Sequence, residues 1–192
     1  MKKLKLFPFL CLISLLCGCN SSTTDRPQQQ DGQIHIGTNI HIDPPEQLTL
    51  SESSDALAAD GLYYATWTDG NSVSYQNSDG DTVDLYDAQL YFLASESPDA
   101  KKAEENCNSW LLAAKGNYNV YSEKVITCND QSYTVISYTC TGNTTPYDHG
   151  VSAFAACGAD AICIELTCIE SYTKDLEPIL TDFLSGCHFE TN

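Results

Sequence analysis

Two histidines stand next to residues that often work with histidine in catalysis. Cys187 precedes His188, and an imidazole that removes the thiol proton would make the sulfur a nucleophile. If "CHFE" is a strand, however, consecutive side chains point to opposite faces and this pair cannot form a hydrogen bond. Asp148 precedes His149 in a long loop, but no serine in a nucleophile-elbow context accompanies them. We therefore expect no catalytic residues and a protein that is not an enzyme.

The acidic stretch "NSDGDTVDLYD" offers oxygen ligands for a hard cation such as calcium. Its first carboxylates, Asp79 and Asp81, do not fit an EF-hand loop, because Thr82 and Ala88 stand where that loop needs Gly and Glu. A hairpin turn with solvated acids explains the stretch more simply. The tandem "IHIGTNIHID" lacks the helical or paired-cysteine frame of a metal site, so we expect neither a metal nor another cofactor.

Aromatic residues gather in the strands expected before the first helix. On a strand, Tyr63 and Trp67 share one side and Tyr64 takes the other, so one set could be exposed. Exposed flat rings stack on sugars and pack against proteins, although Tyr and Trp also favour strands for packing alone. Tyr63 and Trp67, with Asp79 and Asp81, are the candidate binding residues of one alternative, a calcium- or glycan-binding surface lipoprotein.

Residues 1–18 are typical of a secretory signal peptide. Lys2, Lys3 and Lys5 precede an apolar run over 6–16, which is shorter than the roughly 20 residues of a membrane-spanning helix. The run ends in "LCGC", which resembles the bacterial lipobox: an aliphatic residue, two small residues and the cysteine that receives lipid. By this resemblance Cys19 is lipidated and becomes the first mature residue. The protein would then be anchored on the extracytoplasmic face of a bacterial cell membrane or outer membrane.

Residues 19–50 have the composition of a flexible tether. The segment "NSSTTDRPQQQDGQ" is polar, and some 30 residues of this kind span on the order of 30 Å. The formal net charge is −17, and it becomes about −20 when the three lysines of the signal are removed. Such a charge disfavours nucleic acid and anionic headgroups as partners. We expect a membrane contact through the lipid anchor and an unidentified protein partner.

Seven cysteines lie in the expected domain, residues 51–192. They are Cys107, Cys128, Cys140, Cys157, Cys163, Cys168 and Cys187. None of them forms a C-x₂-C pair, which weakens both a zinc site and a thioredoxin-like redox site. Outside the cytoplasm this density indicates disulfides, and an odd number leaves one thiol without a partner in the chain.

Strand alternation suggests which cysteines pair. Cys157 and Cys163 flank the turn "GADA" six residues apart, and we expect both on one face of a hairpin, joined by a bridge. Cys107, on the buried stripe of the first helix, would meet Cys187 if the two helices pack side by side. The remaining cysteines are Cys128 and Cys140, each at a strand end, and Cys168, the expected free thiol.

Two amphipathic helices are indicated among runs of strands. The first begins at Ser97, which would cap the open N–H groups, and ends at Gly116. The second covers 175–185, where apolar residues recur at i, i+3, i+4 and i+7. Period-2 patterns predict strands at 62–67, 72–76, 83–86 and 88–94, then at 119–128, 133–141, 151–157 and 162–171, and finally at "CHFE".

These elements predict an α+β domain in which both helices cover one face of an antiparallel sheet, because short connections make neighbouring strands antiparallel. Phe154, Ile164 and Leu166 would then face the helices, and Glu165 and Thr167 would face water or a partner. The order of elements, with the ending "DLEPILTDFLSGCHF", resembles the PsbP-like α/β/α fold, which includes tethered bacterial lipoproteins. The resemblance implies a binding or assembly module, and no family site matches residue by residue.

We therefore expect a membrane-anchored extracytoplasmic lipoprotein with a non-catalytic protein-binding or assembly role. A calcium- or glycan-binding surface protein is the first alternative, and an exported thiol enzyme is the second.

Overall fold

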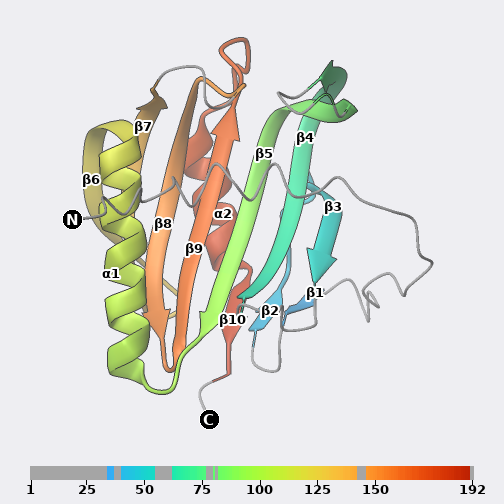
Figure 1. Cartoon of the computed structure of the whole chain (residues 1–192). Helices are drawn as coiled ribbons and strands as arrows, with labels where there is room; N and C mark the ends of the chain where they lie inside the picture. Colours follow the sequence, from blue (N-terminus) through green and yellow to red (C-terminus); the bar gives the residue numbers. More distant parts are fainter. Residues whose placement is uncertain are drawn as a thin grey trace.

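A computed structural model describes residues 34–36, 40–54, 62–76, 80, 82–141 and 146–190. Its centre is a seven-stranded antiparallel sheet in the order β3-β4-β5-β9-β8-β7-β6 (Figure 1). The strands are β3 (Thr49–Ser54), β4 (Leu62–Gln76), β5 (Thr82–Glu96), β6 (Tyr118–Cys128), β7 (Gln131–Cys140), β8 (His149–Cys157) and β9 (Asp160–Cys168). The helices are α1 (Ala100–Asn117) and α2 (Leu176–Ser185). The expected α+β class and order of elements are confirmed.

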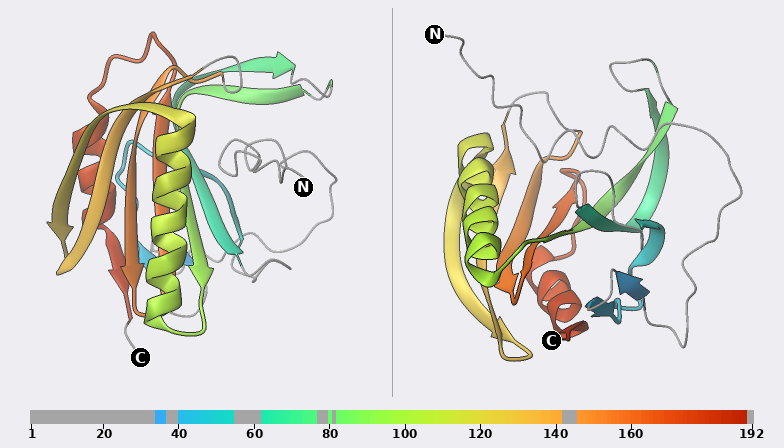
Figure 2. Two further views of the ribbon diagram at one scale, coloured as in Figure 1. Left: turned by 60° about the vertical axis from the view of Figure 1, so that its left-hand side comes forward. Right: turned by 60° about the horizontal axis from the view of Figure 1, so that its bottom comes forward.

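The two helices cover opposite faces of the sheet (Figure 2). Leu93 and Cys163 pack with α1, whereas Phe92 and Ile164, one residue away on the same strands, pack with α2. We call these the α1 face and the α2 face. The expectation of both helices on one face is wrong, because β5 and β9 are apolar on both sides. A strand buried on both faces needs a cover on each.

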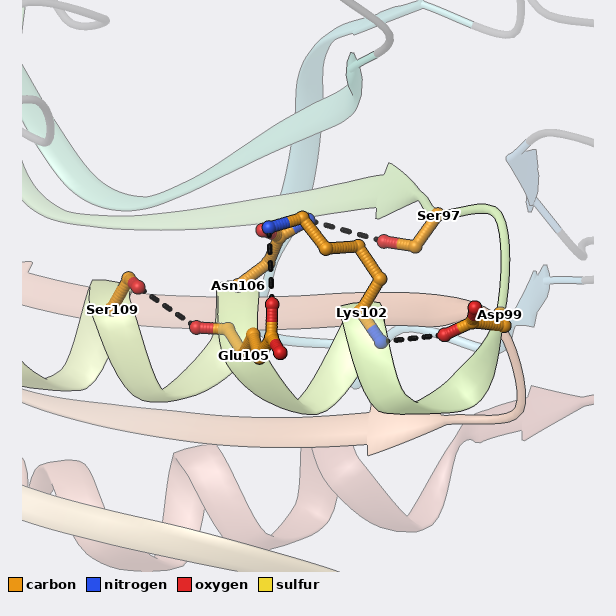
Figure 3. Close-up of polar contacts among 6 residues, drawn as sticks. All are labelled: Ser97, Asp99, Lys102, Glu105, Asn106 and Ser109. Atoms are coloured by element: carbon orange, nitrogen blue, oxygen red, sulfur yellow. Dashed lines mark hydrogen bonds and ion pairs between the residues drawn. The ribbon is translucent and has the colours of Figure 1, made fainter.

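Polar contacts fix the start of α1 (Figure 3). Asp99, not Ser97, is the N-cap, since its Oδ1 accepts a hydrogen bond of 2.8 Å from the backbone N–H of Lys102. Ser97 Oγ instead accepts a hydrogen bond of 3.1 Å from Asn106 Nδ2. This second bond ties the middle of the helix to the strand end that precedes it.

Helix α2 follows the predicted pattern. Asp175 caps it, and its apolar stripe is buried on the α2 face: Leu176, Ile179, Leu180, Phe183 and Leu184. The Phe183 ring meets the indole of Trp67 edge to face, with centroids 4.9 Å apart. This contact lies at the centre of the larger core cluster.

The folded part of the chain begins earlier than expected. Residues 34–50 were predicted within the tether, but they include β1 (Ile34–Ile36), β2 (Ile40–Ile42) and the start of β3. Strands β1, β2 and β10 (Cys187–Phe189) form a separate three-stranded sheet. Ile42 is fully buried, and the Asp43 N–H donates to the Gly186 carbonyl at 2.9 Å. Cys19 lies outside the described residues. Of the two helices in the described part of the chain, neither is long and apolar enough to cross a membrane.

Strands β4 and β5 are longer than expected, because the break expected between strands 62–67 and 72–76 is a bulge within a continuous pairing. Gly70 adopts φ +84° there, and a β-carbon would lie 2.4 Å from Asp87 Oδ2. The β6–β7 turn uses Asn129 and Asp130 at φ 49° and 61°, which matches the twist of a two-residue hairpin.

Candidate functional site

The α1 face carries polar and aromatic side chains in its centre. We name this group the tyrosine–glutamate cluster, and it consists of Tyr64, Tyr91, Tyr118, Tyr138, Ser152 and Glu165. Helix α1 packs on β6, β8 and β9, and in Figures 1 and 2 it lies away from β4. Tyr64 and Tyr91, on β4 and β5, are half-buried and stack with centroids 6.2 Å apart. The cluster therefore runs from beneath the helix toward the part of the face that α1 leaves uncovered.

Glu165 lies in the middle of β9, with Tyr91 and Ser152 directly opposite it on the two neighbouring strands. Its Oε1 accepts a hydrogen bond of 3.1 Å from Tyr118 Oη. Its Oε2 is occluded and has no hydrogen-bond partner in the part of the chain that the structure describes. A buried carboxylate oxygen without a donor is costly, so it calls for an explanation such as a bound water, an ion or a functional role.

Close packing holds the rest of the cluster. Tyr118 and Tyr138 stack in parallel, with centroids 4.1 Å apart, and Ser152 Oγ donates to Tyr138 Oη at 3.1 Å. Gly150 makes room for this ring, because a β-carbon there would lie 2.7 Å from Tyr138 Oη. The side chains around Glu165 are thus pre-organised by the strands and not by mobile loops.

The electrostatics follow from burial. Burial raises the pKa of the Glu165 carboxyl to about 7, although the hydrogen bond from Tyr118 acts in the opposite direction. Burial and the nearby Glu165 charge raise the pKa of Tyr138 well above its ordinary value. At neutral pH the site therefore holds the neutral phenol of Tyr138 near a carboxyl that is partly protonated. A cationic group that reached Oε2 would favour the ionised form.

A second constellation lies at one end of the α2 face. Cys168 Sγ is 3.1 Å from His149 Nε2, and His149 Nδ1 is 3.0 Å from Asp148 Oδ2. These are the contacts of a nucleophile, a base and an orienting acid. The sequence indicated Asp148 and His149 as a loop pair, but it placed Cys168 in the core without a polar partner.

The thiol of this constellation is not poised for attack. Cys168 is fully buried, and burial, followed by the Asp148 charge, raises the pKa of its thiol to about 12. A catalytic cysteine needs the opposite shift and an accessible sulfur. The arrangement fits a hydrogen-bonded core thiol. Cys187 and His188 point to opposite sides of β10, one buried and one exposed, as the sequence indicated.

A cleft of about 350 Å³ lies beside β3 and β4. Its lining is mostly polar: Gln47, Thr49, Leu50, Ser51, Thr68, Asp69, Gly70 and Tyr86. Asp69 Oδ2 accepts hydrogen bonds from Tyr172 Oη at 2.6 Å and from Lys174 Nζ at 2.5 Å, so the carboxylate is held in place.

Two of the binding residues predicted from the sequence, Tyr63 and Trp67, do not form an exposed platform. Trp67 is fully buried against Phe183, so its use as an exposed platform is wrong. Tyr63 packs against the same core. Asp79 and Asp81 lie outside the described residues. Within the described part, no group of three or more His, Cys, Asp or Glu side chains is arranged to hold a metal ion.

All seven domain cysteines are present as thiols. Cys157 belongs to the core of the α2 face and Cys163 to that of the α1 face, so the bridge expected between them does not fit. Cys107 and Cys187 are likewise separated by the sheet, because one lies on α1 and the other in the α2-face core. Both expectations depended on the wrong placement of faces.

Cys128 and Cys140, the two remaining disulfide candidates, lie on opposite faces of the sheet. Cys128 packs against the α2-face core, whereas Cys140 packs against the α1-face core. Glu165 was expected to face water or a partner, and it was not among the candidate site residues. Its signal was an acidic residue in the otherwise apolar run "AICIELTC".

Three solved structures show similarity to this chain. CyanoP, the PsbP of the cyanobacterium Synechocystis, is 14% identical and covers 75% of this chain and 93% of its own, with a TM-score of 0.40. A Bacteroides thetaiotaomicron protein covers 79% of this chain and 45% of its own (10% identity, TM-score 0.35). The match to the extracellular domain of Mycobacterium tuberculosis PknH covers 66% of this chain and 65% of that domain's chain (12% identity, TM-score 0.37). No protein-family model and no curated protein matches. Similarity at this level carries no information on function.

Proposed function

We propose that this protein is a lipid-anchored, extracytoplasmic binding module without catalytic activity, and that Glu165 receives a basic group of a protein partner. The observation that carries the proposal is Oε2 of the half-buried Glu165, which has no hydrogen-bond donor among the described residues. The side chains over this oxygen must move aside to admit the partner's group. The oxygen lies in a cluster of tyrosines, the residue type enriched where proteins bind one another.

The chemistry of the cluster selects the partner group. A lysine or arginine side chain would supply the missing donor and a positive charge, and aromatic faces attract such a cation. The mature chain carries a net charge of about −20 if the signal is removed, which would draw a basic partner toward it. The signal sequence and lipobox-like "LCGC" support export and an anchor at Cys19.

Binding of short peptides tests this proposal. The full-length protein in detergent is titrated with fluorescent Gly/Ser peptides that carry one arginine, or glutamine in its place. We expect the arginine peptide to bind at least about tenfold tighter, and more tightly at pH 8 than at pH 6, because Glu165 is protonated below about 7. Glu165→Gln should abolish the preference, and Glu170→Gln, which changes an exposed carboxylate, should keep it. Equal binding of both peptides, or a preference that survives Glu165→Gln, would refute the proposal.

The cleft beside β3 and β4 favours a second candidate, a glycan-binding role. Its volume of about 350 Å³ is within the range of small-ligand sites, and its hydroxyl, amide and carboxylate groups suit a sugar. Tyr86 would supply a ring for stacking. A glycan array with the wild type and Tyr86→Ala decides this candidate. We expect at least one glycan to bind the wild type and to be lost in the variant, and an array without any signal would remove the idea.

A further inference from the structure

We propose that Cys107 of α1 and Cys163 of β9 form a disulfide in the exported protein and thereby link the helix to the sheet. Both residues lie in the α1-face core cluster. Cys163 is directly opposite Leu93 and Phe154, the apolar side chains on which α1 packs. The proposal depends on export but not on the role of Glu165.

The two cysteines lie at the same height above one end of the sheet. Ser97 N–H donates to the Ala159 carbonyl at 2.8 Å, which brings the start of α1 next to the β8–β9 turn. Cys107 is seven residues beyond Ala100, or about 10 Å along a helix. Cys163 is three residues beyond Asp160, or about 10 Å along a strand that runs in the same direction (Figure 1).

The rotation of α1 directs Cys107 toward the sheet. Asn106 Nδ2 bonds Ser97 Oγ, as Figure 3 shows, and this contact fixes the helix about its axis one residue before Cys107. Ala103 and Ala114, on the same helical stripe as Cys107, are buried against the sheet. Burial first, and then the charges of Glu165 and Cys107, raise the pKa of Cys163. Cys107 also contributes to the raised pKa of Cys157, which lies behind the sheet, so the shared face and not the charge selects Cys163.

The other cysteines are placed less well. Cys140 is also on the α1 face, but it lies nine residues beyond Gln131 on β7. It is therefore about 30 Å from the end of the sheet at which α1 begins, whereas Cys107 is about 10 Å from that end. Cys157 and Cys187 are in the α2-face core, behind the sheet. A disulfide needs Cα atoms within about 7 Å, and Cys163 is the cysteine that shares both the face and the height of Cys107.

The bond would form by thiol–disulfide exchange during folding. The oxidant is a protein disulfide of the oxidising compartment. One cysteine thiolate of the chain attacks it, forms a mixed disulfide and releases the oxidant's first thiolate. The second cysteine thiolate then attacks the mixed disulfide and releases the oxidant's second thiolate. The chain loses two protons and two electrons, and the oxidant leaves as a dithiol. Burial raises the pKa of Cys107 to about 11, so thiol–disulfide exchange is slow once α1 has packed. The bond should therefore form before α1 packs on the sheet.

Peptide mapping tests the proposal on the full-length protein. The protein is purified from membranes with a thiol-blocking maleimide present at lysis, and is then cleaved after Lys and Glu and before Asp. These cuts place Cys107 on 106–115, Cys163 on 160–165, and each other domain cysteine on a peptide of its own. We expect peptides 106–115 and 160–165 to be joined by a disulfide that a reductant opens. Maleimide on both cysteines, or Cys107 joined to another peptide, would overturn the proposal.

Serine variants separate the bridge from a packing effect. Cys107→Ser, Cys163→Ser and the double variant should each lower the melting temperature by the same amount, about 10 °C, because any of them removes the one bond. Cys168→Ser is the control, in which the 107–163 linkage should persist. Additive losses in the double variant would contradict a bond. Failure of the arginine-peptide assay would leave this result unaffected.

Discussion

The α2 face of the sheet is covered by apolar side chains, whereas the α1 face carries tyrosines and Glu165 at its centre. On the α2 face Trp67 and Phe183 pack edge to face, and both are fully buried. On the α1 face the carboxyl of Glu165 keeps an oxygen without a donor in the described chain, whereas the polar atoms without a partner in the α2-face core, Trp67 Nε1 and Tyr133 Oη, belong to uncharged groups. Apolar burial stabilises a fold, whereas an unsatisfied polar atom lowers stability. A buried ionisable group without a donor is more costly than an uncharged one, and this difference is the basis of the binding role that we propose for part of the α1 face.

The largest expected effect is on the α2 face. Trp67→Ala should lower the free energy of unfolding by about 3–5 kcal/mol, because it leaves a cavity against Phe183. Urea denaturation followed by circular dichroism measures the change. Leu112→Ala on the outer side of α1 is the control, since Leu112 is 69% exposed and the expected change is within about 0.5 kcal/mol. A loss below about 1 kcal/mol for Trp67→Ala would contradict this account of the α2 face.

The next effect is on the α1 face and has the opposite sign. The pKa of Glu165 is raised from 4.5 to about 7. Between these two pH values the folded protein therefore keeps a proton that the unfolded chain releases. Wild-type stability should therefore fall as the pH rises from about 4.5 to 7, and remain lower above it. Glu165→Gln should match the wild type near pH 4 and exceed it by about 2–3 kcal/mol at pH 8.

Denaturation at pH 4, 6 and 8 measures this difference. Glu170→Gln is the matched control, because its carboxylate is exposed and the same substitution should leave the wild-type pH dependence unchanged. A Glu165→Gln profile that is parallel to the wild type would show that Glu165 does not titrate near neutrality.

The register of one hairpin explains why the sequence predicted the elements but not the site. The turn "GADA" was correct, and pairing Cys157 with Cys163 across it appeared natural. In the structure Cys157 pairs with Asp160 and Phe154 with Cys163, so the register differs by three residues. An odd shift exchanges the two faces of a strand. The same register places His149 opposite Cys168, a contact that spacing along the chain did not reveal.

The position of the helices was equally hidden. Alternation correctly separated Glu165 from Ile164 and Leu166, but the central strands are apolar on both faces and do not indicate which helix covers which side. The pattern of α2 was clear, because one stripe of the helix carries its apolar residues. The early strands were missed because short segments in a polar context resemble a tether, although Ile40 and Ile42 are buried.

Asp69 is the carboxylate that contrasts with Glu165. Burial acts to raise its pKa, but hydrogen bonds from Lys174 and Tyr172 outweigh burial, and the pKa lies below its ordinary value of 3.8. Its contribution to stability is therefore present above about pH 4 and is lost as the pH falls through the folded-state value. Asp69→Asn should lower the stability by about 1–2 kcal/mol at pH 7 and by less at pH 3. Denaturation at the two pH values checks this, and an equal loss at both would contradict the role of the charge.

The smallest effects should come from two ion pairs that join each helix to the edge strand β6. Lys124 Nζ lies 2.5 Å from Glu177 of α2, and Lys115 Nζ of α1 lies 2.7 Å from Glu123. Each partner is about one-third to one-half exposed, so water and salt screen both pairs. Lys124→Ala and Lys115→Ala should each cost about 0–1 kcal/mol, and less in 1 M salt. If either variant lost more than about 2 kcal/mol, the position of that helix would depend on its ion pair with the edge strand. The comparison of the two faces would then have to include the ion pairs at the edge of the sheet.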